Sequence, residues 1–104
     1  MSHASLIGCI PESLENLENL VKLNLQRNKL SGKLPDMFGR MAKLQTLSLD
    51  RNHLEGLIPK SIGRCLQLTM LTCQGNRFSN SIPESIFQLP LLWSTKFQKQ
   101  LDCL

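Results

Sequence analysis

One pattern, repeated every 24 residues, limits what this chain can fold into. Three consecutive segments align without an insertion: LVKLNLQRNKLSGKLPDMFGRMAK (20–43), LQTLSLDRNHLEGLIPKSIGRCLQ (44–67) and LTMLTCQGNRFSNSIPESIFQLPL (68–91). The flanking residues form a partial N-terminal repeat (1–19) and a degenerate C-terminal tail (92–104). A period of about 20 to 50 residues indicates a solenoid, because one such unit cannot bury its own apolar side chains without stacked neighbours. We therefore expect one domain of about three and a half repeats.

The composition fits a small folded domain and excludes several kinds of partner. Of the 104 residues, 41% are hydrophobic and 21 are leucine. The net charge of +4 is spread along the chain, without the Lys/Arg runs of a nucleic-acid or membrane-surface patch. No apolar stretch approaches the roughly 20 residues that cross a bilayer, and the first residues do not read as a signal peptide. The sequence therefore predicts no nucleic-acid partner and no membrane span, and it leaves the compartment open.

Two apolar columns and an asparagine column predict a short strand in each repeat. Leu23 and Leu25 alternate with polar neighbours, which is the period of a half-buried strand. An inward asparagine just after such a strand can satisfy backbone groups that have no partner in the sheet. We expect a ladder of three of them, one per repeat: Asn28, Asn52 and Asn76.

A proline column predicts the other half of each repeat. Proline suits the first turn of a helix, because its missing N–H would have no partner there. The pattern predicts a helical turn at about 12–17 and a separate strand at about 22–26. The prolines of the four copies are Pro11, Pro35, Pro59 and Pro83.

The segments LVKLNLQRNKLSGKLPDMFG and LQTLSLDRNHLEGLIPKSIG resemble the leucine-rich repeat of the plant-specific subclass, LxxLxLxxNxLxGxIPxxLGxLxx, and the likeness covers about residues 6–97. The resemblance implies an α/β repeat solenoid, a right-handed superhelix. Short parallel strands would lie on its concave face and 3-10 or short helical turns on its convex face. It also implies a parent such as a receptor-like kinase or receptor-like protein, a family found mostly at the plasma membrane or outside the cell. The chain contains no N-x-[ST] glycosylation site.

Residues that could carry chemistry are few. His3 and His53 lie on ordinary polar positions, and no catalytic or phosphate-binding motif is present. The cysteines show no CxxC spacing that would suggest zinc. Cys65 and Cys73 replace leucine or methionine in core columns, so we expect small buried hydrophobic side chains there, and disulfide formation stays open. The sequence predicts no enzyme, no cofactor and no metal site.

The outward strand positions are the candidate binding residues. Equivalent positions of parallel strands lie about 4.8 Å apart and form stripes along one face. The resemblance makes this concave face the expected binding surface for a protein or peptide. The candidates are Lys22, Asn24, Gln26, Arg27, Thr46, Ser48, Asp50, Arg51, Met70, Thr72 and Gln74. If the period persists, Ser94, Lys96, Gln98 and Lys99 extend the stripes.

These features together predict a non-catalytic binding module, a fragment of a receptor-like ectodomain. One alternative is an inhibitor-type binder similar to polygalacturonase-inhibiting proteins, which would need more repeats and both caps. Another is a truncated scaffold without a ligand of its own. Because a solenoid needs polar caps, the open ends of this chain are also expected to promote self-association.

Overall fold

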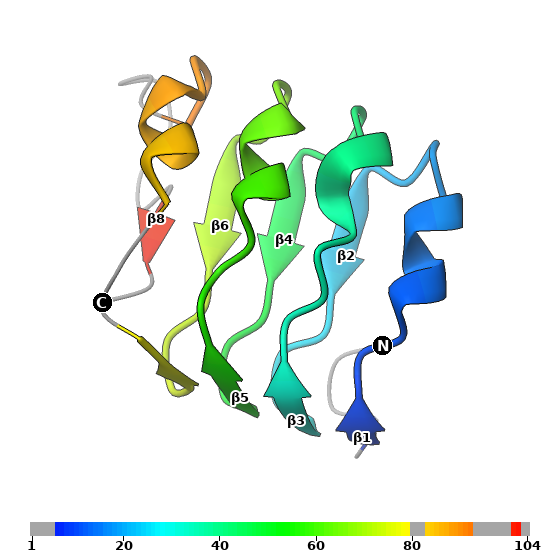
Figure 1. Cartoon of the computed structure of the whole chain (residues 1–104), viewed down its shortest axis with the longest axis vertical. Coiled ribbons are helices and arrows are strands. Elements are labelled where there is room, and N and C mark those ends of the chain that lie inside the picture. The colour runs from blue at the N-terminus through cyan, green and yellow to red at the C-terminus, as the bar shows by residue number, and fades with distance from the viewer. Residues whose placement is uncertain (1–5, 80–82, 93–100, 103–104) are drawn as a thin grey trace.

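The computed structural model stacks the repeats side by side in parallel sheets, and it describes residues 6–79, 83–92 and 101–102. One sheet, called the main sheet below, contains in spatial order β2 (Lys22–Asn24), β4 (Thr46–Ser48), β6 (Met70–Thr72) and β8 (Leu101–Asp102). Leu23 pairs with Leu47 and Leu47 with Leu71, so each of these repeats contributes one strand in register. The strands run side by side behind the helices in Figure 1. This arrangement confirms the repeat solenoid.

A second parallel sheet, which the repeat pattern did not lead us to expect, forms a side wall. This side sheet contains β1 (Ile7–Cys9), β3 (Lys29–Lys33), β5 (His53–Gly56) and β7 (Arg77–Phe78). Its register sets Gly8 against Leu30 and Gly32 against Leu54. Gly8 and Gly32 have φ angles of 89° and 78°, a left-handed conformation that costs other residues about 1–2 kcal/mol. The glycine column is therefore a requirement of this sheet.

Short 3-10 helices form the third side of each repeat. They are η1 (Glu12–Asn16), η2 (Phe38–Arg40), η3 (Lys60–Arg64) and η4 (Glu84–Gln88). Three of them begin directly after a proline, whose carbonyl accepts the first helical hydrogen bond, as from Leu14 N to Pro11 O at 3.2 Å. The predicted helical turn at 12–17 and the following strand are confirmed. Among the described residues, no helix has the length and apolarity needed to span a membrane.

The leucine columns fill one continuous core between the sheets and the helices. Leu44, Leu47 and Leu54 are completely buried, and each packs among side chains from neighbouring repeats. Leu92, with 1% of its surface exposed, continues the column of Leu44 one copy beyond the third repeat, as the period predicts. Burial of such a side chain stabilises the fold by about 1.5–3 kcal/mol, but only when the adjacent repeat covers it.

Asn52 holds the backbone of two repeats together. Its side-chain amide donates to the carbonyl oxygens of Leu25 at 2.9 Å and Leu49 at 3.0 Å, which lie one repeat apart. Its Oδ1 atom accepts a hydrogen bond from the backbone N–H of Leu30 at 3.1 Å. Asn52 is only 4% exposed, so these backbone groups have little access to water as a substitute partner.

The same bonding pattern recurs at the other two asparagines. Asn76 Nδ2 donates to Leu49 O at 2.8 Å, and its Oδ1 accepts from Leu54 N at 3.0 Å. Asn28 Oδ1 accepts from Leu6 N at 2.9 Å. The three side chains thus form a ladder just inside the turn from the main sheet to the side sheet, as the asparagine column predicts.

The fourth strand of the main sheet does not follow the period. The residue paired with Leu71 is Leu101, whereas a period of 24 would place Thr95 there. The same column holds buried leucine in three repeats, and a threonine there would bring a hydroxyl group into it. The predicted extension of the stripes to Ser94, Lys96, Gln98 and Lys99 lies outside the described residues, and the register of β8 contradicts its premise.

The cysteines differ in state. Cys65 is a free, completely buried thiol, and its burial raises the thiol pKa to about 11. Cys9 is free and exposed. Cys73 is buried in the core as expected, and it is also disulfide-bonded, a point that the sequence left open. A core column does not by itself exclude a covalent role.

The ladder predicts that Asn52→Ala destabilises the protein far more than Asn24→Ala. Asn52→Ala leaves buried carbonyl and N–H groups unpaired, whereas the exposed Asn24 makes one local bond to Gln26 N at 3.2 Å. We expect the two variants to differ by about 1–3 kcal/mol in the free energy of unfolding, measured by urea denaturation. Equal midpoints and slopes for the two variants would show that the ladder does not stabilise the fold.

Candidate functional site

The residues predicted to bind a partner lie along the outer face of the main sheet and just beyond it. Within β2, Leu23 is buried while Lys22 and Asn24 on either side are exposed, which is the alternation of a strand with one face outward. In the neighbouring strands the outward residues are less accessible. Thr46, Met70 and Thr72 are half-buried.

Ser48 departs from its expected role. It occupies an outward position between Asn24 and Thr72 in the register, yet only 8% of its surface is exposed. A side chain with so small an exposed fraction offers little surface to a partner. The centre of the sheet is consequently a poor contact point, and the accessible polar groups gather at the carboxyl ends of the strands.

At that end of the main sheet, two consecutive positions of three repeats enclose a hollow of about 280 Å³. We call it the arginine hollow. It is lined by Gln26, Arg27, Asp50, Arg51, Gln74 and Gly75. Five of these six residues are among the predicted binding residues, and the structure brings them together. The sixth, Gly75, continues the column of the arginines and leaves that end of the hollow without a side chain.

The backbone beneath the hollow is fixed by hydrogen bonds that continue the sheet beyond its strands. Arg27 N donates to Asp50 O, and Arg51 N donates to Gln74 O, both at 2.8 Å. Below them, Leu25 N donates to Ser48 O at the same distance. The backbone of the two arginines is therefore held in register by the hydrogen bonds of the sheet. A ligand needs to order only their side chains.

Both arginines have a left-handed backbone. Arg27 and Arg51 each have a φ of 57°, and Gly75 in the same column has a φ of 74°. Residues other than glycine lose about 1–2 kcal/mol in this conformation. Strained residues that persist in a structure often serve a function, so the two arginines stand out from the other exposed cations. The signal for this backbone conformation in the repeat pattern is the glycine at this position of the third copy.

The hollow carries an excess of positive charge. Asp50 Oδ1 accepts a hydrogen bond from Gln74 N at 2.9 Å, which fixes the carboxylate against the next repeat. Within the described part of the chain, Arg27 and Arg51 form no ion pair, so both guanidinium groups can bind an external hydrogen-bond acceptor. Two arginines beside one aspartate suit a ligand with carboxylate or amide oxygens, because the planar guanidinium pairs bidentately with such groups.

The chemical groups that line the arginine hollow are guanidinium, carboxylate and amide groups. The hollow contains no nucleophile paired with a base. The described residues also include no group of three or more His, Cys, Asp or Glu side chains that could hold a metal ion. His53 lies exposed in β5 of the side sheet, away from the arginine hollow.

Known proteins share this repeat. The family model of the leucine rich repeat matches residues 3–54 and 18–78. The chain is similar to a chain in the crystal structure of the BIR3–SERK2 complex from Arabidopsis thaliana, with 34% identity and a TM-score of 0.79 over 85% of this chain and 47% of that one. No curated protein gives a significant match.

Two further structures show what else is built on similar repeats. The plant peptide hormone receptor RGFR1, in complex with RGF2, is 39% identical with a TM-score of 0.78, over 88% of this chain and 15% of the receptor. A plant ice-binding protein is 34% identical with a TM-score of 0.73, over 78% of this chain and 26% of that one. The chain thus spans less than half the length of each of these three proteins.

The left-handed backbone predicts an unusual order of substitutions at Arg51. Arg51→Gly should leave the stability unchanged or raise it by up to about 1 kcal/mol, because glycine relieves the strain. Arg51→Val should lower stability by about 1 kcal/mol or more, since a β-branched side chain fits this conformation worst. Both are measured by thermal unfolding followed by circular dichroism.

The matched control is Lys29, an exposed cation in β3 whose φ is not positive. At Lys29 the relative stability of the two variants should reverse. Lys29→Val should be at least as stable as the wild type, and Lys29→Gly should be less stable. If valine were tolerated at both positions, the backbone at Arg51 would not be strained.

Proposed function

This chain belongs to the leucine-rich repeat family, and from that membership we propose that it is a non-catalytic module that binds a protein or peptide at the arginine hollow. The observation that carries the proposal is the pair of guanidinium groups on a strained, hydrogen-bonded backbone, with no ion pair to either within the described chain. Such a pair is prepared for an external acceptor.

The chemistry of the hollow favours an extended segment with acidic or amide side chains. Arg27 and Arg51 lie in adjacent repeats, so their Cα atoms are separated by roughly the 4.8 Å spacing of parallel strands. One carboxylate can therefore reach both forks, or two neighbouring acceptors can each take one. The side chains of Gln26 and Gln74 border the same hollow and supply amide donors and acceptors.

Structural neighbours support a peptide or protein ligand without deciding which. RGFR1 is a peptide hormone receptor, and its structure holds RGF2, while the BIR3–SERK2 structure is a complex of two proteins. We propose that this chain is part of a receptor-like kinase or receptor-like protein ectodomain of the same kind. An inhibitor-type binder and a scaffold without a ligand of its own are the alternatives, and the ice-binding neighbour shows that similar repeats also serve outside receptors.

The proposal predicts that charge reversal in the hollow abolishes binding. Peptides are first selected from a random library against the wild-type protein, and their affinities are then measured by calorimetry. We expect the selected peptides to be rich in Asp, Glu, Asn and Gln. Arg27→Glu combined with Arg51→Glu should weaken them by at least about thirtyfold, because truncating one hot-spot arginine alone costs about 2 kcal/mol or more.

The control is Lys29→Glu combined with Arg77→Glu. It makes the same change of charge at exposed positions of the side sheet, in β3 and β7. This pair should change the affinity only slightly, and circular dichroism should be unchanged in both double variants. The proposal is wrong if the control pair weakens the selected peptides as much as the arginine pair does, or if no peptide is selected.

A further inference from the structure

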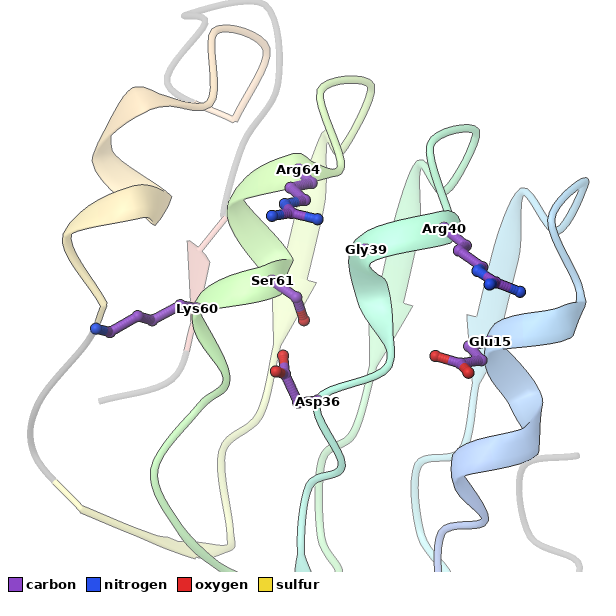
Figure 2. Close-up of a pocket in the computed structure, with 7 residues that line it drawn as sticks. All are labelled: Glu15, Asp36, Gly39, Arg40, Lys60, Ser61 and Arg64. Atoms are coloured by element: carbon purple, nitrogen blue, oxygen red, sulfur yellow. The ribbon is translucent and has the colours of Figure 1, made fainter.

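A second hollow, of about 390 Å³, opens on the helix side of the solenoid. We call it the charged hollow. It lies beside η2 and η3 and is lined by Glu15, Asp36, Gly39, Arg40, Lys60, Ser61 and Arg64. Figure 2 shows these residues on three successive repeats. None of them belongs to the arginine hollow, and the sequence pattern had not singled any of them out as binding residues.

We call the contact between two neighbouring 3-10 helices a seam. In the seam between η3 and η4 the two helices pack closely. Ser85 Oγ donates to Lys60 O at 2.9 Å, across the seam. A Cβ atom placed on Gly63 would lie only 2.3 Å from the Cβ of Ser85, so the serine fills the space that this glycine leaves. Ser85 therefore packs this seam at Gly63.

The preceding seam, between η2 and η3, stays open because of one substitution in the repeat. Three copies have serine at the second position after the proline, but the second copy has Met37, whose apolar side chain is completely buried. The backbone N–H of Met37 donates a hydrogen bond to the carbonyl oxygen of Pro35 at 2.9 Å. The helix η2 begins at Phe38, three residues after the proline, whereas the other helices begin directly after theirs. The N–H of Phe38 donates to Ser61 Oγ at 3.2 Å instead of to the proline carbonyl.

Ser61 does not cover Gly39 in the way that Ser85 covers Gly63. A Cβ atom placed on Gly39 would have only Arg64 within 4 Å, with Nη1 at 3.4 Å and Cδ at 3.8 Å. The guanidinium of Arg64 thus lies over the glycine, at the floor of the hollow. The two seams thus differ in what covers the glycine, which is Ser85 at Gly63 and the Arg64 side chain at Gly39.

Charges of opposite sign line opposite edges of the charged hollow. In Figure 2, the guanidinium groups of Arg40 and Arg64 lie toward one edge and the carboxylates of Glu15 and Asp36 toward the other, while Lys60 points away. In the part of the chain that the structure describes, no ion pair joins these arginines to these carboxylates. Each edge therefore keeps its charge for a ligand, and a purely acidic or purely basic ligand would be repelled by one of them.

We infer that the charged hollow binds a peptide segment in which an acidic residue stands next to a basic one. The ligand carboxylate lies over Gly39 between the forks of Arg40 and Arg64, and the ligand ammonium group meets Asp36 and Glu15. The hollow beside Gly39 and Arg64 admits the carboxylate, and the guanidinium groups hold it by charge-assisted hydrogen bonds. This site is independent of the arginine hollow, which favours acidic or amide-rich segments.

The test uses backbone amide chemical shifts of the isotope-labelled protein. Capped peptides of sequence Gly-Glu-Lys-Gly, Gly-Glu-Glu-Gly and Gly-Lys-Lys-Gly are titrated to millimolar concentrations. Only the Glu-Lys peptide should produce saturating shifts at Gly39, Arg40, Ser61 and Arg64. Absence of shifts there, or equal shifts with all three peptides, would overturn the inference.

Two variants locate the binding. Gly39→Leu should fill the hollow and abolish the shifts, and the fold should tolerate it, because φ at Gly39 is not positive and a Cβ there meets only a flexible side chain. Arg64→Gln should raise the dissociation constant roughly tenfold. Arg77→Gln, an exposed cation on the side sheet, is the control and should change nothing.

The result also separates the two sites. The double variant Arg27→Glu with Arg51→Glu should bind the Glu-Lys peptide as the wild type does. If Arg77→Gln weakened the peptide as much as Arg64→Gln, or if Gly39→Leu left the shifts intact with an unchanged melting temperature, the peptide would not occupy the charged hollow.

Discussion

The fold depends on how each repeat satisfies the backbone groups at its turn. Where the chain leaves the main sheet for the side sheet, carbonyl groups point inward and find no partner in either sheet. The carboxamides of Asn28, Asn52 and Asn76 fill this gap, and the amides of Asn52 and Asn76 each join two adjacent repeats. Leucine burial drives the repeats together, but apolar contacts alone would allow them to slide. The asparagine bonds have direction, so together with the hydrogen bonds of the sheets they fix one register.

That fixed register also determines what the surface can present. The asparagine in each repeat directly follows the left-handed residue of the arginine column, so the bonds of Asn28 and Asn52 hold the turns that carry Arg27 and Arg51. Two neighbouring positions of the same turn thus have different roles. The asparagine side chain points inward and stabilises the fold, and the arginine side chain points outward, where a partner can reach it. The strain of the left-handed arginines is small beside what the ladder and core contribute, which is why the fold can carry it.

The columns shared by the copies predicted the strands of the main sheet, the asparagine ladder, the helical turns and the core. The assembly of those strands into one parallel sheet and the 3-10 form of the turns were implied by the resemblance to the leucine-rich repeat. The side sheet was missed, since its signal is a glycine whose positive φ cannot be seen in a pattern of apolar residues. The burial of Ser48 and the pairing of Leu101 with Leu71 are tertiary features that the repeat pattern does not encode. The charged hollow arises where Met37 breaks a column, so averaging over repeats hides it.

The most direct test of the central claim is amide hydrogen exchange in the wild type and in Asn52→Ala. Leu30 N donates to the Asn52 side chain, while Arg27 N and Arg51 N donate to carbonyls of the next repeat. If the ladder holds the turns, the variant should lose protection at all three amides together, while the amides within β4 and β6 stay protected. Loss of protection at Leu30 alone, with Arg27 and Arg51 as protected as in the wild type, would show that the arginine column is held without the asparagines.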